Sequence, residues 1–419
     1  MSLRRTTTWA LALLAWLAAG VSPIPASGPL YVTGPGANFP GQPYHWTLNP
    51  IPYTTDLGGL GNQTNTWADT MVLQAFQVWG GVSTADISFQ KTQNDLSYDV
   101  TGSTIVDFRN AIGGCNDATQ PTNSIIYDLD GSAVAAYLGA ANRNLVLGFA
   151  GPVCLDTVAG VYTRGWAVLN GRFIDGIDTS DNPEKPLTIF KVAFIHEFGH
   201  LLGLDHSQIN LNCLTDELSC PPGSADDQGL PIMFPVLVKS TLELSPDDIA
   251  SISALYPNNP TFESTTSRIQ GHVFFSDGET PAQGYNVIAR RVGDGRITAV
   301  SCVSGFLFTA GAGNPLAPAN GTELSYGSHD TSLIGYYDIP GLPPGNYTVE
   351  VEAINNSVDP PFVGPSGVGP IGSLLGFQFK MPWTAAQLTV TVTANNTEVG
   401  KDLIFDGTPP RYDAWEDGP

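Results

Sequence analysis

The sequence has few charged residues and few of them are basic. Only 13% of its 419 residues are Asp, Glu, Lys or Arg, and 39 acidic against 17 basic residues give a formal net charge of −22. Such an acidic chain is poorly suited to nucleic acid or to an anionic membrane surface, so we expect neither as a partner. Glycine and proline are abundant instead, at 46 and 33 residues, which favours short strands and many turns.

Long apolar runs are lacking beyond the N-terminus. Arg4 and Arg5 precede the run at 9–21, which small residues follow and which is too short to cross a bilayer comfortably. This order is typical of a secretory signal peptide over 1–27, in preference to a buried N-terminal helix. We therefore expect a secreted, extracellular protein without membrane insertion.

Cysteine is also scarce, and none of the five cysteines is in C-x₂-C spacing, which disfavours a cysteine zinc site. Export favours disulfides over five free thiols. The short loop between Cys213 and Cys220 makes them the first expected pair, and Cys115 with Cys154 is the second. Cys302 would then remain unpaired.

The chain divides into segments of different character. Strand-like and helical patterns alternate first, which predicts an α+β domain, and short strands with turns follow, which predict an all-β antiparallel sandwich. The expected segments are a lead or short pro-segment at 28–43, the α+β domain at 44–257, a linker at 258–267, the sandwich at 268–407 and an acidic tail at 408–419.

Periodicity predicts three helices and several strands in the α+β domain. The helices are expected at 64–81, 187–204 and 245–257, the second ending near Gly203. Strands are expected at 85–91, 103–109, 144–150 and 167–175. In the sandwich they are expected at 268–277, 285–292, 297–304, 345–354 and 387–394.

Half of the six histidines lie within eleven residues. The pattern is His196-Glu197-x-x-His200-x-x-Gly203-x-x-His206. Residues i and i+4 project from one helix face, so His196 and His200 can bind one metal ion, with Glu197 beside it. Gly203 can adopt a positive φ and end the helix, so that His206 becomes the third ligand. Three ligands leave the fourth position of a zinc ion open, as in catalytic sites.

The alternative is a core helix whose histidines are satisfied by hydrogen bonds. A buried Glu197 without a metal would be costly, so the metal site is favoured. Met233 in "LPIMFPV", 27 residues after His206, is flanked by prolines that favour a tight turn. Taken alone it would be an ordinary core methionine, but its position after the histidines favours a hydrophobic base beneath them.

With these motifs the chain resembles the matrixin-like branch of the metzincin zinc metallopeptidases. "HEFGHLLGLDHS" is similar to the zinc motif, "PIMFP" to the methionine turn, "LSPDDIASISALYP" to the closing helix and "YHWTLNPIPY" to the first strand. The resemblance covers about 44–257. It implies a twisted five-stranded sheet with three helices, a cleft across the zinc ion, and peptide-bond hydrolysis.

The chain departs from that family in two places. No cysteine precedes Cys115, so a propeptide cysteine cannot cap the zinc ion, and Pro235 stands where some metzincins have a tyrosine ligand. Related domains often bind calcium, and Asp128 and Asp130 offer carboxylates for it. The spacing is not that of an EF-hand, and a simple Asp-Gly turn is the favoured alternative.

The second half resembles carboxypeptidase regulatory-like or transthyretin-like sandwiches in "YYDIPGLPPGNYTVEVEAI", and this resemblance implies no catalysis. The sequence therefore predicts a monomeric, secreted zinc endopeptidase acting on proteins or peptides. Glu197 would be the general base that takes a proton from an activated water. The alternatives are a zinc-binding but non-catalytic adhesion protein, and a sandwich that binds carbohydrate or a cell-surface partner as the main functional unit.

Overall fold

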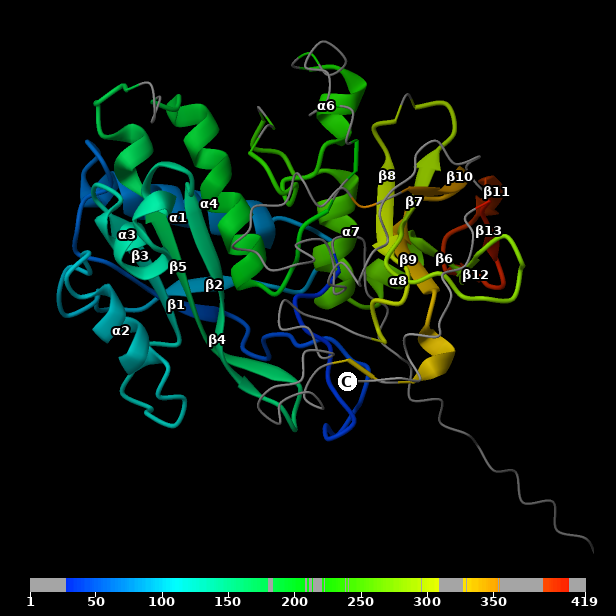
Figure 1. The fold of residues 1–419 in the computed structure, drawn as a ribbon, viewed down its shortest axis with the longest axis horizontal. Helices are drawn as coiled ribbons and strands as arrows, with labels where there is room; N and C mark the ends of the chain where they lie inside the picture. Colours follow the sequence, from blue (N-terminus) through cyan, green and yellow to red (C-terminus); the bar gives the residue numbers. More distant parts are fainter. Residues whose placement is uncertain are drawn as a thin grey trace, which may run out of the picture.

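The computed structural model describes residues 28–406, except for 180–183, 208, 211–212, 214–220, 222, 238, 240, 295, 309–326, 329, 353 and 355–386. The predicted signal peptide and acidic tail lie outside the described residues. Two lobes are arranged along the long axis, a mixed α/β lobe and a strand-rich lobe, with helix α7 (Pro246–Leu255) between them (Figure 1). None of the helices in the described part of the chain is long and apolar enough to cross a membrane.

The first lobe contains a five-stranded mixed sheet of order β2-β1-β3-β5-β4. Strands β2, β1, β3 and β5 are parallel, whereas β4 runs antiparallel to β5 and forms one edge. The expected number of strands in this sheet is therefore present. The bounds are β1 (Ile51–Thr55), β2 (Phe89–Lys91), β3 (Asn123–Asp128), β4 (Gly148–Asp156) and β5 (Val161–Asn170).

Helices cover both faces of this sheet. Strand side chains alternate between faces, so Tyr127 and Leu169 share a core with α1 (Asn65–Gly80) and α4 (Leu187–Leu201). Their neighbours Ile126 and Val168 point the other way, into a core with two further helices. These are α2 (Ile105–Ile112) and α3 (Ser132–Leu138), and a short α6 (Ala225–Gly229) lies closer to the second lobe.

The three predicted helices are present as α1, α4 and α7. The lobe also contains α2, α3 and α6, so the predicted number of helices was too low. The strand expected at 103–109 is wrong, because this segment forms α2. Its buried residues are Ile105, Phe108 and Ile112, which have the spacing of one helix face. The apolar run was too short for periodicity to separate strand from helix.

Two other expected strands are displaced. The segment at 144–150 begins in a 3-10 turn (Ala140–Asn144), and β4 starts only at Gly148. The segment at 167–175 ends in a second 3-10 turn (Gly171–Ile174), while β5 starts earlier than expected.

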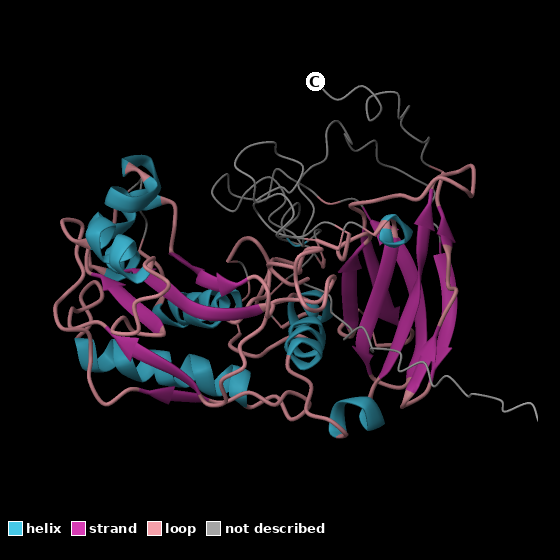
Figure 2. Cartoon of the chain, turned by 90° about the horizontal axis from the view of Figure 1, so that it is seen from below, coloured by secondary structure: helices cyan, strands magenta, loops and turns pink. Residues whose placement is uncertain are grey.

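The second lobe consists of two packed sheets, seen side by side in Figure 2. One is antiparallel with the order β11-β10-β7-β8, and the other has the order β12-β6-β13 with β9 paired to β6. Their apolar residues form one shared core. The strands are β6 (Ser267–Phe274), β7 (Asn286–Arg291), β8 (Ala299–Val303), β9 (Tyr336–Leu342), β10 (Gly345–Glu352), β11 (Gln387–Val392), β12 (Asn396–Glu398) and β13 (Leu403–Ile404).

The strand-rich lobe is not the purely antiparallel sandwich that the sequence predicted. Strands β12 and β13 both pair parallel to β6, and only β9 pairs antiparallel to it. β12 follows β11 after only three residues but pairs in the other sheet, and a pattern of short strands cannot reveal which partner or direction a strand takes.

The expected linker at 258–267 is structured. It contains the short helix α8 (Thr261–Thr265), whose Phe262 is buried, and β6 already begins at Ser267. The lobes also touch directly, since the Ser301 backbone N–H on β8 donates to Asp247 on α7 at 2.9 Å. The strand-rich lobe therefore packs against the helix that closes the α/β lobe.

The lead at 28–43 lies against both lobes. Pro29 pairs with Leu204 in an antiparallel bridge, and the Leu30 N–H donates to the Gly203 carbonyl. Val32 is fully buried in the core of the strand-rich lobe. This segment therefore reaches the chain that follows α4, next to the predicted metal site.

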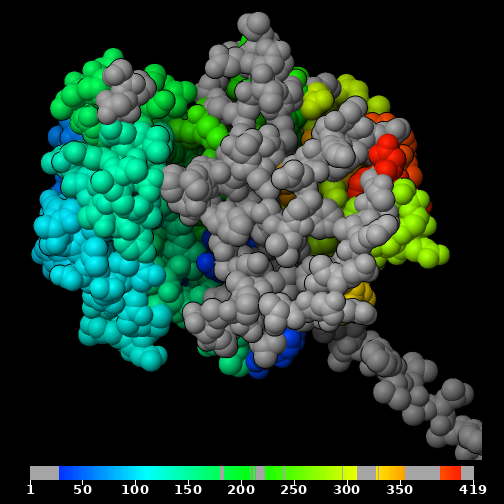
Figure 3. Space-filling view, viewed as in Figure 1, coloured from blue at the N-terminus to red at the C-terminus, as the bar shows by residue number. Residues whose placement is uncertain are grey.

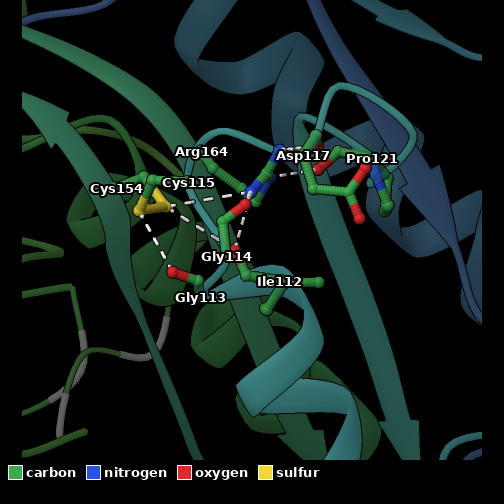
Figure 4. The surroundings of a disulfide bond; sticks show 8 residues. All are labelled: Ile112, Gly113, Gly114, Cys115, Asp117, Pro121, Cys154 and Arg164. Carbon is green, nitrogen blue, oxygen red and sulfur yellow. Dashed lines mark hydrogen bonds between the residues drawn. A yellow bond between two sulfur atoms is a disulfide. The ribbon is translucent and has the colours of Figure 1, made fainter.

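The disulfide between Cys115 and Cys154 confirms the second expected pair and joins the loop after α2 to β4 (Figure 4). Arg164 on β5 donates to the carbonyls of Ile112 and Gly114 in the same region. Cys302 is free and buried, as expected. Cys213 is disulfide-bonded, and its expected partner Cys220 lies outside the described residues.

Candidate metal centre

Helix α4 carries the first two histidines and is anchored by aromatic packing. Phe190, Phe194 and Phe198 are fully buried on it. The Phe198 ring stacks on Phe76 of α1 with the ring centres 4.2 Å apart. The Trp79 indole N–H of α1 also donates to the Ile195 carbonyl at 2.8 Å. The apolar residues of the motif thus fix the helix, and its polar face is oriented by that packing.

The three predicted histidines converge. Their Nε2 atoms are 3.2 Å apart for His196 and His200, 3.1 Å for His200 and His206, and 3.3 Å for His196 and His206. They form the one group of potential metal-binding side chains found among the described residues. All three are buried. The sequence spacing therefore predicted their proximity correctly.

Hydrogen bonds at the other ring nitrogen define the tautomers of two histidines. His196 Nδ1 lies 2.7 Å from the Ile232 carbonyl oxygen, and His200 Nδ1 lies 2.8 Å from that of Leu204. Because a carbonyl oxygen only accepts, each Nδ1 carries the proton and each Nε2 presents a lone pair. Lone pairs that face one another at such short distances repel unless a cation lies between them.

These distances suit a small divalent cation. Nitrogens bound to zinc at roughly 2.0–2.1 Å in a tetrahedron are about 3.3–3.4 Å apart. Burial lowers the pKa of His196, and burial together with the neighbouring His206 and His196 lowers the pKa of His200 well below its ordinary value. The rings of His196 and His200 are therefore neutral near pH 7, in the form that ligates metal. Imidazole sets also suit other transition metals, so the donor set alone does not select zinc.

Gly203 makes the turn that delivers His206. Its φ is 98°, which confirms the predicted positive value, and helix α4 ends two residues earlier. A Cβ at this position would lie 2.6 Å from the Tyr162 ring, so no larger residue fits. The chain then passes through Leu204, whose carbonyl binds His200.

Met233 lies beneath the histidines. It is fully buried, and a Cβ on Gly199 would lie 2.2 Å from its sulfur, so the thioether packs directly against the middle of the metal-binding turn of α4. Its carbonyl accepts from the Ser207 N–H at 2.9 Å. The methionine turn thus contacts both the helix and the residue after His206.

Asp248 on α7 is a site residue that the sequence analysis missed. Its carboxylate accepts from the N–H groups of Ile232 at 2.8 Å and Met233 at 3.1 Å, and so holds the turn that binds His196. It also accepts from the Ser245 N–H as part of a capping box. The pattern "SPDD" signalled only the helix start, and the second use of the carboxylate depends on tertiary contact.

Glu197 lies at the side of the cation position, against the edge strand. A Cβ on Gly148 of β4 would lie 2.9 Å from its Cγ. Burial raises the pKa of Glu197 to about 8, and among the described residues its carboxylate has no hydrogen-bond donor. A cation held by the histidines would favour the charged form instead. The charge of Glu197 thus depends on whether a cation lies between the histidines.

The site opens into a cleft with a volume of about 620 Å³. Strand β4 forms one wall, the segment at 235–237 forms another, and Leu30 and Tyr31 of the lead form part of the rim. On the surface, the cyan residues around α2 and α3 lie at the end of the molecule away from the strand-rich lobe (Figure 3).

The two carboxylates of the suggested calcium site make contacts within the protein, although one oxygen of Asp128 has no hydrogen-bond partner, and calcium binding there stays a prediction. The Asp128 carboxylate accepts from the Val134 N–H at 2.8 Å, and Asp130 pairs with Arg143 at 3.2 Å. Gly131 between them has a φ of 81° and precedes helix α3. These contacts correspond to the Asp-Gly turn that the sequence favoured.

Comparison with known protein families finds none whose pattern matches this chain. A search of curated proteins likewise finds no similar sequence.

Proposed function

We propose that the protein is a metal-dependent endopeptidase of the metzincin type, matrixin-like, with zinc as the metal and with export to the cell exterior. The observation that carries the proposal is the convergence of three Nε2 atoms within 3.3 Å of one another, next to a buried glutamate in an open cleft. The resemblance of the motifs around His196 and Met233 to that family supports the same reading.

His196, His200 and His206 would hold the metal through Nε2. When bound, zinc acts as a Lewis acid that polarises a peptide carbonyl and lowers the pKa of a water molecule. Glu197 would accept the proton of that water and pass it to the leaving amine. A cation held by the histidines would favour the charged carboxylate, which is the form that accepts a proton.

A peptide would bind along strand β4. This strand pairs with β5 on one side only, so its other edge has backbone groups that can pair with an extended chain. That edge lies beside Glu197, since Gly148 is the first residue of β4. The reacting carbonyl of a bound peptide would thus be brought next to the general base.

The test is hydrolysis of a proteome-derived peptide library by the purified full chain, with metal content measured on the same sample. We expect about one equivalent of zinc and endoproteolytic cleavage that a chelator abolishes and added zinc restores. Cleavage that persists without metal, or metal-loaded protein that cleaves nothing, would contradict the proposal.

A zinc-binding but non-catalytic adhesion protein remains the rival function. It would need the histidines but would have no use for Glu197 in the cleft. The same library experiment separates the two, since the rival predicts a full metal complement with no hydrolysis.

A further inference from the structure

The cleft has an aromatic wall on the face of the sheet opposite to α4. It consists of Tyr137 on α3, Phe149 on β4 and Trp166 on β5. The ring centres of Tyr137 and Phe149 are 5.6 Å apart, and those of Phe149 and Trp166 are 5.3 Å apart. Tyr137 keeps 38% of its surface exposed, whereas Trp166 is buried at 5%. The wall therefore continues the cleft around the start of β4.

Arg109 on α2 lies on this wall. Its guanidinium carbon is 5.6 Å from the centre of the Trp166 ring, and the side chain lines the same cavity as the three histidines and Glu197. Its Nε is buried and has no hydrogen-bond partner. Arg109 forms no ion pair with any carboxylate of the described residues, although the whole chain carries a net charge of −22.

The two buried arginines of the described chain are satisfied internally, whereas Arg109 is partly exposed. Arg164 donates to backbone carbonyls, and Arg290 pairs with Glu350 and Glu352. A guanidinium with no internal acceptor, placed in a cleft, has donor capacity left for a ligand.

The chain that follows Arg109 at the end of α2 is attached to strands β5 and β4. The carbonyls of Ile112 and Gly114 accept from Arg164 of β5, and Cys115 is bonded to Cys154 of β4 (Figure 4). The last turn of α2 is thus fixed to the two strands that carry the aromatic wall. Arg109 is therefore part of the cleft wall rather than a side chain on a loose surface helix.

We infer that Arg109 and the aromatic wall form a subsite for a carboxylate-bearing side chain of the bound peptide. This inference rests on the proposed function only in assuming that the cleft binds peptides. The planar guanidinium donates to both oxygens of a carboxylate. Apolar rings on the other sides exclude water and strengthen that contact. The preferred ligand is a peptide with Glu or Asp at one position, despite the acidic charge of the protein as a whole.

A purely structural role for Arg109 is the competing explanation. A cation in the last turn of a helix is favoured by the helix dipole, and the stacking on Trp166 adds to it. That role predicts an effect of substitution on stability but none on the preference between two ligands.

The experiment measures peptide binding by the full chain carrying Glu197→Gln, so that the ligand is not consumed. The probes are fluorescent decapeptides of neutral composition in which a single Glu, or its uncharged counterpart Gln, is moved along the sequence. Fluorescence anisotropy gives the affinity of each pair. We expect one position at which Glu binds about tenfold more tightly than Gln, as for one charge-assisted hydrogen-bonded contact.

Adding Arg109→Gln should abolish this preference, and Arg109→Lys should retain part of it. Arg291→Gln is the matched control, because it removes the same charge from an exposed position of the strand-rich lobe and should change nothing. A preference that is absent at every position, or that persists in Arg109→Gln, would overturn the subsite. If Arg109→Gln does not fold, the ratio of the affinities for the Glu and Gln peptides in Arg109→Lys decides. A ratio that is the same as with Arg109 overturns the inference.

The two proposals fail in different ways. A Glu preference that depends on Arg109 in a protein that hydrolyses no peptide would refute the peptidase and retain the subsite. Hydrolysis of the library without any Glu preference in binding would refute the subsite alone.

Discussion

The two lobes differ in the surroundings of particular arginine and histidine side chains. In the strand-rich lobe Arg290 pairs with Glu350 and Glu352, and Arg268 pairs with Asp338. In the α/β lobe the Nε2 atoms of His196, His200 and His206 face one another within 3.3 Å, and the buried Nε of Arg109 has no hydrogen-bond acceptor. Buried polar groups that are left unsatisfied are costly, so they mark places where a ligand completes the structure. The candidate metal centre and its cleft accordingly lie in the first lobe.

The largest effect is expected from His206→Ala, which removes one of three ligands. We expect the purified variant to retain less than about one-tenth of the metal after dialysis and to lose peptide hydrolysis, since three ligands are the minimum of catalytic zinc sites. Metal analysis checks the outcome. His272→Ala in the strand-rich lobe is the control, and equal metal loss in both variants would contradict the assignment.

Glu197→Gln should leave the metal in place and reduce peptide hydrolysis by about 10²–10⁴-fold, the usual contribution of a general base. The amide keeps the size of the side chain against Gly148 but cannot accept the proton. Metal content and hydrolysis are measured on one preparation. Substantial activity in a fully loaded variant would exclude Glu197 as the base.

Arg290→Ala tests whether the ion pairs of the strand-rich lobe contribute to stability and not to metal binding. Removing the cation leaves Glu350 and Glu352 without their partner, which we expect to cost about 2–3 kcal/mol of unfolding free energy, below the value for a fully buried pair because the glutamates are partly exposed. Urea denaturation measures the loss, and metal content should stay unchanged. Loss of metal from the folded variant would show that the two lobes are not functionally separate.

Asp248→Asn should weaken metal affinity by about 10-fold, the lower end of the effect of residues that orient metal ligands. The amide can accept only one of the two backbone N–H groups of Ile232 and Met233, so the turn that orients His196 is loosened. Competition with a chelator of known affinity gives the constant. An unchanged affinity would reduce Asp248 to a helix cap.

The smallest effect concerns Asp247, the buried carboxylate between the lobes. Burial raises its pKa to about 8, with the neighbouring Asp248 adding, although hydrogen bonds from Ser207 and Ser301 oppose the shift. Because the pKa of Asp247 is higher in the folded protein than in the unfolded chain, its protonation contributes to the free energy of unfolding. This contribution is complete below about pH 4 and is lost as the pH rises through 8. The side chain in Asp247→Asn does not titrate and so does not lose this contribution. The free energy of unfolding of the variant, relative to that of the native chain, should therefore be higher at pH 8.5 than at pH 5.

We expect this improvement to be at least about 1.4 kcal/mol, the value of one pKa unit. Urea denaturation of both proteins at both pH values gives the difference, in which the titration of all other groups cancels. A difference that does not change with pH would show that Asp247 is ionised in the folded protein at both values.

The sequence by itself determined the parts of this protein that depend on local spacing. The i, i+4 histidines, the glycine three residues later and the third histidine define a cluster because helix geometry and a positive φ leave little choice. The same holds for helices α1, α4 and α7, whose long periodic patterns and end signals are unambiguous. Short apolar runs such as 103–109 carry no such information, and the prediction failed there.

The tertiary structure alone decided what lies around those histidines. Asp248 is 42 positions after His206 and reaches the methionine turn only because α7 packs beside it. Arg109 becomes part of the cleft only because α2 covers the sheet face opposite α4 and is tied to β4 by the disulfide. Contacts between residues far apart in the chain depend on how the faces of helices and sheets pack together. Local patterns in a single sequence do not predict that packing.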